Sequence, residues 1–341
     1  MDELVMVIVP AWNAENYIEA TLRSVLAQTY RALRIFVVDD GSTDTTPQIL
    51  ARLAAEDPRL SFVTVANGGP AAARNCALAR LPEETRWVMF LDADDQLLPE
   101  ALETALANGD GADLVLFGYA IRRQDGSLRP YCEPEELLDR EGLARALPRL
   151  YKANLLNQVW AKLFAAPILE GLRFPDYRWG EDRLFLFDAL ERAETIKVLP
   201  QILHRYIMHE GESLITRYYE KKFDVCCEID GRLEELCAGL GVREDAPFRY
   251  MFLKSVWSCL TTLYSPSCRL SRSEKREVAR RILADGRVRR RCRDTGAGLP
   301  AETLCALLRS GSPGLALAGA QALAWSGERF PRLFMAMKHR K

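Results

Sequence analysis

The stretches VVDDGST, residues 37–43, and FLDADD, residues 90–95, decide the fold class of this 341-residue chain. Each begins as a short apolar run and ends in acidic and small polar residues. Over the first 120 residues, runs with the β-branched and aromatic composition of buried strands occupy residues 5–9, 34–38, 60–65, 87–91 and 114–119. Segments with the apolar spacing of helices lie between them, at residues 14–28, 45–55, 70–79 and 99–107. This alternation predicts an α/β fold with a mostly parallel sheet flanked by helices.

Composition describes a globular chain. The 48% of hydrophobic and 27% of charged residues exclude a disordered chain and suffice for one large domain with an extension. The nine cysteines form no CxxC pair and are odd in number, which favours a reducing compartment. The N-terminus lacks signal-peptide features, and the apolar stretch 314–325 is shorter than the roughly 20 residues that span a bilayer. We therefore expect a cytoplasmic protein.

Charge is distributed unevenly around the net value of −1. Residues 269–341 hold 17 Lys or Arg and 6 Asp or Glu, a balance of +11, so the residues before them carry −12. Helical apolar spacing at 221–240 and 247–264, followed by the basic run 276–293, predicts a basic helical extension. Such an extension suggests an anionic membrane surface or a phosphate-bearing acceptor as its partner, and a solvated helical face or a homodimer contact is the alternative. Nucleic acid is disfavoured because the basic run lacks interleaved aromatic residues.

Polar residues follow three of the predicted strands, and ligands of parallel sheets bind at the strands' carboxyl ends. The residues of interest are Pro10, Trp12 and Asn13 after the first strand, Asp39 to Ser42 after the second, and Asp92 to Asp95 after the fourth. The acids after the second strand are equally well explained as helix caps. The three carboxylates in the last group repel one another unless a cation offsets them. Carboxylate ligands suit Mg²⁺ or Mn²⁺, so we predict a divalent cation there.

Five segments together resemble glycosyltransferase family 2, which has the GT-A fold. They are VIVPAWNAENY (7–17), SVLAQTY (24–30), VVDDGST (37–43), GGPAAARN (68–75) and FLDADD (90–95). The resemblance is strong over residues 4–120 and weaker to about residue 216. Ala11 and Trp12 depart from the commoner small residue followed by Tyr, which should change packing near the nucleotide base. The resemblance implies a hexosyltransferase-type enzyme of bacterial capsule, lipopolysaccharide or exopolysaccharide synthesis that uses a nucleotide-sugar.

The resemblance also implies the residues that bind the donor. Pro10, Trp12 and Asn13 should line the nucleotide base, and Asp40 should accept a hydrogen bond from uracil N3 if the donor is a UDP-sugar. Arg74, from the ARN segment, should contact the diphosphate. The alternative interpretation of Arg74 is that it is a surface residue of a helix with no ligand.

The DxD motif implied by the resemblance consists of Asp92, Ala93 and Asp94. Asp94 is expected to bind the metal directly and Asp92 to lie nearer the ribose. Asp95 is expected to be an indirect or alternate metal ligand. A cation at this position would offset the charge that develops on the leaving diphosphate.

The segment FPDYRWGEDRLFLF, residues 174–187, resembles the family element that carries the catalytic base. The resemblance assigns that role to Asp182 first and Glu181 second, in an inverting single displacement. Acids are also favoured at the start of a helix. The two interpretations are compatible, because a helix start would keep the carboxylate ionised for proton transfer.

Two further segments resemble weaker family elements. NQVWAKLF, residues 157–164, makes Trp160 and Lys162 candidates for the acceptor or diphosphate side. HRYIMHEGESLIT, residues 204–216, resembles a loop that closes over the donor, so Arg205 and His209 are candidates for phosphate contacts. A lone histidine is more often structural.

These observations predict a catalytic domain over 1–216, with a nucleotide-sugar-binding half (1–120) and an acceptor-side half (121–216), and a helical extension over 217–341. The acceptor is expected to be a glycan or a lipid-linked saccharide, with the enzyme attached peripherally at the inner face of the cytoplasmic membrane. A non-catalytic nucleotide-sugar-binding scaffold is the first alternative, disfavoured by the joint presence of Asp92, Asp94 and Asp182. A nucleotidyltransferase is the second, disfavoured because no Gly-rich loop with a basic residue follows the first strand.

Overall fold

The computed structural model describes residues 3–123, 125–209, 216–243, 246–292 and 299–329. The chain divides into two compact units. The sheet unit comprises Met1–Glu210 and Leu236–Val242, and the helical unit comprises Gly211–Glu235 and Arg243–Lys341.

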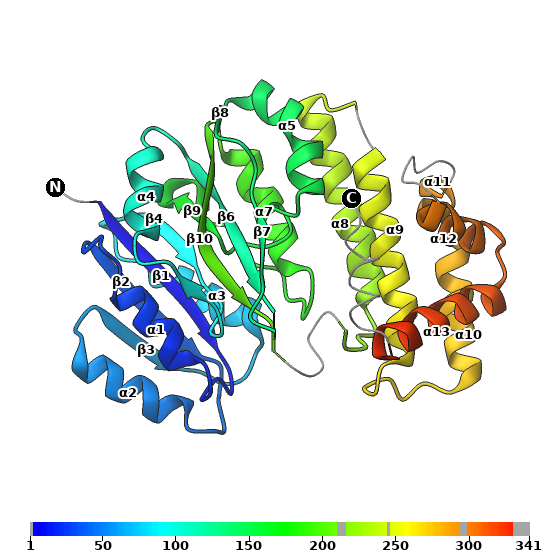
Figure 1. Ribbon diagram of the computed structural model, residues 1–341, viewed down its shortest axis with the longest axis horizontal. Helices are drawn as coiled ribbons and strands as arrows, with labels where there is room; N and C mark the ends of the chain where they lie inside the picture. Colours follow the sequence, from blue (N-terminus) through cyan, green and yellow to red (C-terminus); the bar gives the residue numbers. More distant parts are fainter. Residues whose placement is uncertain (1–2, 124, 210–215, 244–245, 293–298, 330–341) are drawn as a thin grey trace. The chain divides into compact units, whose positions relative to one another are not determined.

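The first half of the sheet unit is parallel, as its sequence predicts. Its strands, in the spatial order β3-β2-β1-β4, are β1 (Leu4–Ala11), β2 (Leu33–Asp39), β3 (Leu60–Thr64) and β4 (Thr85–Phe90). The helices that alternate with them and precede the next long strand are α1 (Ile18–Leu26), α2 (Thr46–Glu56), α3 (Pro70–Leu78) and α4 (Ala101–Asn108). All the strands and helices predicted over the first 120 residues are present, with shifted ends (Figure 1).

The sheet continues beyond β4 with the strand predicted at residues 114–119 and with further strands that the sequence pattern did not predict. Its order runs on as β9 (Lys162–Ala165), β6 (Leu114–Arg122), β10 (Ile196–Ile207) and β5 (Gln96–Leu97). Two further strands, β7 (Leu128–Tyr131) and β8 (Glu136–Leu138), pair with β6 and β10. Strand β9 is antiparallel to both β4 and β6, and β6 is parallel to β10. Six strands, β1 to β4, β6 and β10, therefore share one direction, so the sheet is mostly parallel, as predicted.

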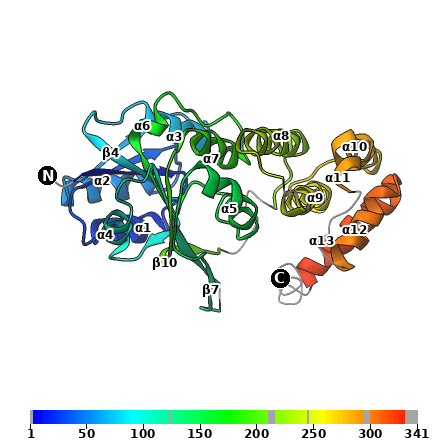
Figure 2. The same cartoon turned by 90° about the horizontal axis from the view of Figure 1, so that it is seen from above.

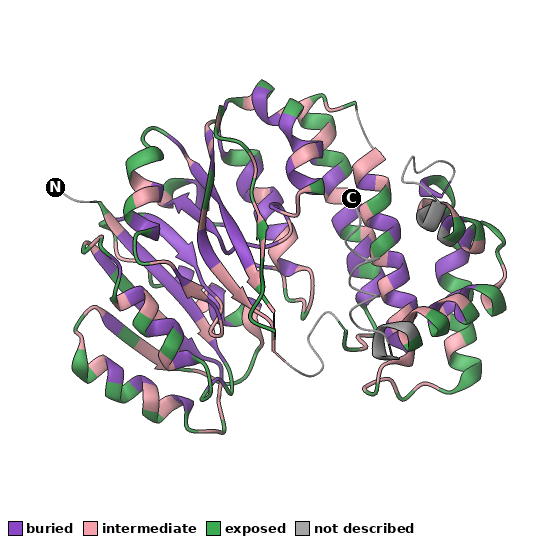
Figure 3. Ribbon diagram, in the orientation of Figure 1, coloured by how far each residue is buried: buried purple, intermediate pink, exposed green. Residues whose placement is uncertain are grey.

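Helices cover both faces of the sheet, which explains why central strands such as β1 are almost uniformly apolar. Figure 2 shows α3, α6 (Ala166–Leu169) and α7 (Glu181–Arg192) on one face, and α1 and α4 on the other. The central strands are buried (Figure 3), and Val5, Val7 and Ile8 of β1 have no exposed surface. Each such side chain contributes about 1.5–3 kcal/mol relative to an exposed one.

An aromatic cluster fixes α7 beneath the end of β4. Phe174 stacks on Phe185 of α7 with ring centroids 3.8 Å apart, and Phe90 meets both rings edge-on, at 5.3 and 5.6 Å. The cluster places the start of α7 close to the residues that follow β4. The remaining helix of the sheet unit, α5 (Arg140–Lys152), begins at Asp139, whose carboxylate accepts a hydrogen bond from the backbone N–H of Gly142 at 2.7 Å.

The helical unit contains α8 (Lys222–Leu240), α9 (Ala246–Thr261), the 3₁₀ turn η1 (Thr262–Tyr264), α10 (Arg272–Ala284), α11 (Gly286–Arg291), α12 (Leu299–Arg309) and α13 (Pro313–Arg329). The last residues of α8, from Leu236, belong to the sheet unit. Phe252 and Trp257 of α9 are buried, which confirms their predicted place in a core. Asp230 of α8 pairs with Arg291 of α11 at 2.9 Å. Among the described residues, no helix has the length and apolar character needed to cross a membrane.

Candidate active site

The loops after β1 and β2 are joined at the carboxyl edge of the sheet. Asn13 adopts a left-handed backbone conformation (φ 48°). Its backbone N–H donates to Ser42 Oγ at 2.9 Å, and its side-chain Oδ1 accepts from the backbone N–H of Thr43 at 2.8 Å. The neighbouring Trp12 is 55% exposed, and Pro10 is half-buried. A large exposed indole beside two anchored loops provides a surface on which a planar base can stack.

Asp40 holds the loop before α3. Its two carboxylate oxygens accept hydrogen bonds from the backbone N–H groups of Gly68 and Gly69, both at 2.8 Å, and the residue is 3% exposed. The loop passes close to Gly41 (φ 69°), where a Cβ atom would lie 3.0 Å from the backbone nitrogen of Asn67. Each carboxylate oxygen has a second lone pair, so the predicted hydrogen bond from uracil stays a prediction.

Arg74 of α3 brings the acids of two distant segments together. Its guanidinium donates to Asp92 after β4 and to Asp182 of α7, both at 2.8 Å, and to Glu181 at 3.2 Å. The Arg74 side chain is 4% exposed, so the alternative of a surface residue is wrong. A buried charge is costly unless it is paired. Arg74 therefore depends on these carboxylates as much as they depend on it.

The neighbouring residue Asn75 fixes the approach to α7. Its side chain donates to the backbone carbonyl of Phe174 and accepts from the backbone N–H of the same residue, both at 2.8 Å. Helix α7 then begins after Gly180, which has a left-handed backbone (φ 88°), with Glu181 and Asp182 in its first turn. The predicted helix start is confirmed. The role of Asn75 was not predicted, although its place in the ARN segment is a signal for it.

Burial and mutual repulsion raise the pKa values of these acids. Burial raises the pKa of Glu181 to about 8, and the charge of Asp182 adds to the shift while Arg74 opposes it. Burial also raises the pKa of Asp182, again opposed by Arg74. Burial lowers the pKa of Lys162 to about 7, with the charge of Asp182 acting in the opposite direction. A carboxylate whose pKa is raised toward neutral pH is a suitable proton acceptor.

The acids after β4 fit a divalent cation. The side chains of Asp92 and Asp94 stay 31% and 40% exposed. Burial, together with the charges of Asp95 and Asp92, raises the pKa of Asp94 to about 7. The described residues do not bring three His, Cys, Asp or Glu side chains together as a metal site. Mg²⁺ and Mn²⁺ commonly take only one or two carboxylates and complete their shell with water and substrate phosphates.

Asp95 does not share the exposed position of its neighbours. It has no exposed surface, and its two carboxylate oxygens contact His204 Nε2 at 2.9 Å and the backbone N–H of Ile207 at 3.0 Å. The structure therefore gives Asp95 no exposed oxygen for the alternate-ligand role that the sequence suggested. His204 was not singled out from the sequence, although it begins the segment HRYIMH.

The residues suggested for the acceptor side are divided between core and surface. Trp160 and Lys162 are 8% and 1% exposed, and the Lys162 ammonium donates to the Trp160 carbonyl at 3.2 Å. This burial gives neither residue a surface for an acceptor. Arg205 is half-buried on β10, and His209 Nε2 lies 3.3 Å from Asp94 Oδ2. Of these four residues, His209 is the one that lies beside the acids after β4.

Comparisons with known proteins identify the family of this chain. The family model of glycosyl transferase family 2 matches residues 6–166. An uncharacterized glycosyltransferase of Haemophilus influenzae is 38% identical over 194 residues, which cover 56% of this chain and 73% of that protein. The chain belongs to glycosyltransferase family 2. The resemblance stated from the five segments is confirmed, and the predicted enzyme class, a glycosyltransferase, is that of the family.

Other relatives are similar to this chain over only part of their length. The chain is 28% identical to glycosyltransferase GlyA of Streptococcus pneumoniae over 65% of its own length, and spans 33% of that protein. It is 33% identical to the succinoglycan biosynthesis protein ExoO of Rhizobium meliloti, with 62% of each chain covered. The crystal structure of S. aureus TarS 1–349 in complex with UDP-GlcNAc superposes with a TM-score of 0.64 at 22% identity, covering 95% of this chain and 91% of that one. This likeness confirms the GT-A fold class.

Proposed function

We propose that this chain transfers a sugar from a UDP-sugar to a hydroxyl group of a glycan or lipid-linked acceptor in polysaccharide biosynthesis. The observation that carries the proposal is the meeting of Asp92, Glu181 and Asp182 around Arg74 at the carboxyl edge of the sheet. The name of ExoO, a succinoglycan biosynthesis protein, supports the pathway, and the UDP-GlcNAc bound to TarS supports the nucleotide. In this proposal residues 1–216 carry catalysis and residues 217–341 form the extension.

The donor occupies the edge formed by the loops after β1 and β4. The base stacks on Trp12, which is 55% exposed, beside Pro10 and Asn13, and its uracil N3–H donates to Asp40. Asp92 and Asp94 hold the divalent cation, Mn²⁺ or Mg²⁺. The cation, when bound, offsets the negative charge of the leaving diphosphate. Arg205 and His209 provide further cationic or hydrogen-bonding contacts to phosphate.

Asp182 acts as the general base. The acceptor oxygen attacks the anomeric carbon of the donor while the Asp182 carboxylate takes the proton of that hydroxyl. The bond between the anomeric carbon and the diphosphate oxygen breaks with its electrons on the diphosphate. A single displacement of this kind inverts the anomeric configuration. Arg74 holds the Asp182 carboxylate at 2.8 Å and supports its ionised form electrostatically.

A panel of nucleotide-sugars tests the proposal. Purified protein should hydrolyse or transfer at least one UDP-sugar with Mn²⁺, and lose this activity when the metal is chelated. Asp94→Ala should weaken metal-dependent donor binding at least about tenfold, since it removes a metal ligand. Asp110→Ala, which changes an exposed acid beyond α4, is the control and should behave as wild type.

Three outcomes of this panel would contradict the proposal or a part of it. Binding without turnover of any donor and acceptor combination would favour the scaffold alternative. If the protein bound no nucleotide-sugar, the proposed donor site would be wrong. If GDP-sugars but not UDP-sugars were bound, the fold and the acids would stand while the assignment of Asp40 to uracil would fail.

We also propose that the helical unit attaches this enzyme to an anionic membrane at the cytoplasmic face. Leu315 and Trp325 of α13 are 51% and 53% exposed, and residues 313–327 contain no charged side chain. Residues 269–341 carry a balance of +11. Exposed apolar side chains near basic ones are typical of interfacial helices. The terminal segment 330–341, whose sequence mixes apolar with basic residues, lies outside the described residues.

Sedimentation with lipid vesicles measures this attachment. The full chain should bind vesicles that contain phosphatidylserine, fail to bind pure phosphatidylcholine, and be released by about 0.5 M salt because salt screens surface charges. Replacement of both Leu315 and Trp325 by Ser should weaken binding at low salt. Equal binding to both vesicle types, or no binding to either, would contradict the proposal.

A further inference from the structure

Asp95 connects two segments that are 109 residues apart in the sequence. One of its carboxylate oxygens shares a 2.9 Å hydrogen bond with His204 Nε2, and the other accepts the backbone N–H of Ile207 at 3.0 Å. All of these atoms lie on or next to β10, just before that strand ends at Ile207. The carboxylate thus fastens the acid segment, residues 92–95 after β4, to the last residues of β10.

The His204 ring is held in position from its other side. Trp160 stacks on it with ring centroids 4.6 Å apart and an angle of 13° between the planes. His204 has no exposed surface, and its Nδ1 atom has no hydrogen-bond partner within the part of the chain that the structure describes. A buried ring nitrogen without a partner costs free energy that an aromatic hydrocarbon of the same size would avoid. The hydrogen bond to Asp95 is therefore what a histidine contributes at this position and a phenylalanine would not.

The end of β10 leads directly to a residue in the candidate site. His209 follows Ile207 by two positions, and its Nε2 atom lies 3.3 Å from Asp94 Oδ2. The His209 ring also packs on Tyr17, at 4.0 Å between ring centroids. One turn along α1 from Tyr17, the Thr21 hydroxyl donates to the Ala93 carbonyl at 2.8 Å. The acid segment is thus fixed from α1 by Thr21 and from β10 through Asp95.

We infer that Asp95 is a positioning residue, which together with His204 holds Asp94 and His209 in the relative arrangement that the donor diphosphate and its cation require. This inference deepens the proposed function and rests on the donor site proposed above. It differs from the role suggested by the sequence, because Asp95 acts through β10 and touches neither cation nor donor. Loss of either partner should release the acid segment from His209 without changing the general base.

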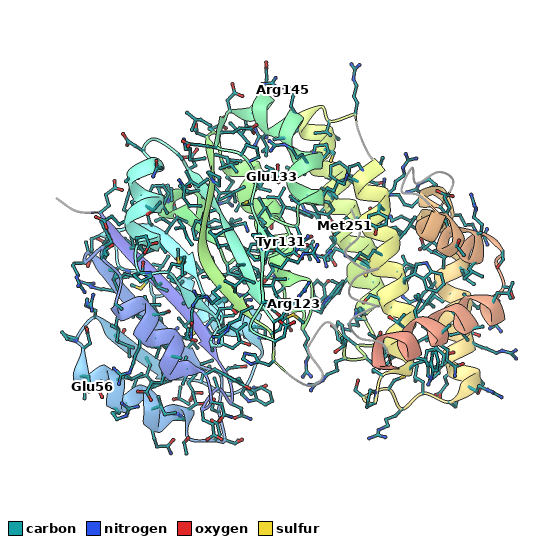
Figure 4. All side chains as sticks on the ribbon, viewed as in Figure 1. Glu56, Arg123, Tyr131, Glu133, Arg145 and Met251 are labelled. Carbon is teal, nitrogen blue, oxygen red and sulfur yellow. The ribbon has the colours of Figure 1, made fainter. Side chains whose placement is uncertain are left out.

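The test compares Asp95→Asn, His204→Phe and the double variant with wild type. Asn preserves the size of Asp95, and Phe preserves the stacking on Trp160. Tyr119→Phe is the matched control. This control removes the Tyr119 hydroxyl, which accepts a hydrogen bond from the Asn154 side chain at 2.8 Å. The Tyr119 ring packs against Trp160 and stacks on Tyr131, which is labelled in Figure 4. The ligand is UDP with Mn²⁺, measured by titration calorimetry, and activity is measured with the donor identified by the panel.

Each single variant should weaken Mn²⁺-dependent UDP binding about tenfold, a loss typical of groups that orient metal ligands. The double variant should bind about as weakly as either single one, because the two residues act as one unit. The loss should appear in KM for donor and metal, with kcat at saturation within about threefold of wild type, since Asp182 is untouched. Tyr119→Phe should stay within about twofold of wild type in each quantity.

Three results would overturn the inference. Weakened binding in Asp95→Asn but not in His204→Phe would show that Asp95 ligates the cation itself. Lower melting temperatures with unchanged affinity for UDP would show that the contact between Asp95 and His204 only stabilises the fold. Additive losses would show that the residues act separately.

Amide exchange of residues 204–209 without ligand should be faster in both single variants than in the control. If wild type binds no UDP, the proposed donor site is wrong. The amide-exchange rates then decide by themselves whether Asp95 fastens β10.

Discussion

Asp182→Asn is expected to lower kcat by about 10²–10⁴-fold, the usual contribution of a general base, while donor affinity changes little. Asn has the size of Asp, and its Oδ1 atom can still accept the hydrogen bond that Arg74 donates to Asp182 at 2.8 Å. It cannot take a proton from the acceptor. Steady-state kinetics of transfer, together with calorimetry of UDP binding, separate the two effects.

Glu181→Gln is the matched variant for this prediction. Glu181 is adjacent to Asp182 in the first turn of α7 and also bonds Arg74. The Glu181 side chain is 8% exposed, whereas the Asp182 side chain is 19% exposed. The more accessible carboxylate is the better candidate for contact with an acceptor. We expect a smaller loss of kcat for Glu181→Gln, and the reverse order would move the base to Glu181.

The pH dependence of kcat provides a second test of the base. Burial raises the pKa of Asp182 above its ordinary value, with Arg74 and Lys162 acting in the opposite direction. Since the ionised carboxylate is the active form, kcat should rise with pH through this raised pKa and fall below it. Lys162→Met removes a positive charge that favours the ionised form, so it should shift this acid limb to higher pH. An acid limb that shifts to lower pH would contradict the assignment.

The parallel half of the sheet could be predicted because its signals are local. Each strand from β1 to β4 is a short apolar run followed by polar residues, and each helix between them has its own apolar spacing. Strands β5 and β9 have two and four residues, too few for a pattern, and β10 contains Pro200 and several polar residues. Their pairing depends on partners far away in the chain, which a single sequence does not specify.

The acids of the candidate site could be predicted as residues but not as an arrangement. Arg74 was expected at the diphosphate, yet it contacts Glu181 and Asp182, which are 107 and 108 residues away. Asp95 looks like its neighbours in the sequence, and only burial beside His204 separates it from them. Lys162 appeared available to a ligand because it is charged, but strand β9 carries it into the core. Local pattern identifies chemical type, whereas long-range packing decides what each group can reach.

Arg74→Met is expected to destabilise the protein by about 3–5 kcal/mol near pH 8, the usual cost of removing one partner from a buried ion pair. Met fills a similar volume, so the loss is mainly electrostatic. Three carboxylates, those of Asp92, Glu181 and Asp182, lose the cation that all of them contact. Arg74→Lys should be intermediate, because one ammonium group cannot reproduce the planar fork that bonds three acids.

The sign of the pH dependence distinguishes this mechanism from a packing defect. Without Arg74, the pKa values of Glu181 and Asp182 rise further above their unfolded values, since Arg74 lowers both in the wild type. Groups with raised folded pKa values stabilise the protein at low pH, and this contribution is lost as pH rises through those values. The defect of Arg74→Met should therefore be small near pH 5 and large near pH 8.

Urea unfolding of wild type and variant at both pH values measures this difference. Arg23→Met is the control, because Arg23 of α1 pairs with Glu19 and Glu56 while its side chain remains 52% exposed. An exposed pair of this kind contributes about 0–1 kcal/mol, and its loss should be nearly independent of pH over this range. A defect in Arg74→Met that matched the control, or that was equal at pH 5 and pH 8, would show that Arg74 does not organise the acids. A large defect only at high pH would establish that one buried guanidinium holds the proposed base and the proposed metal site together.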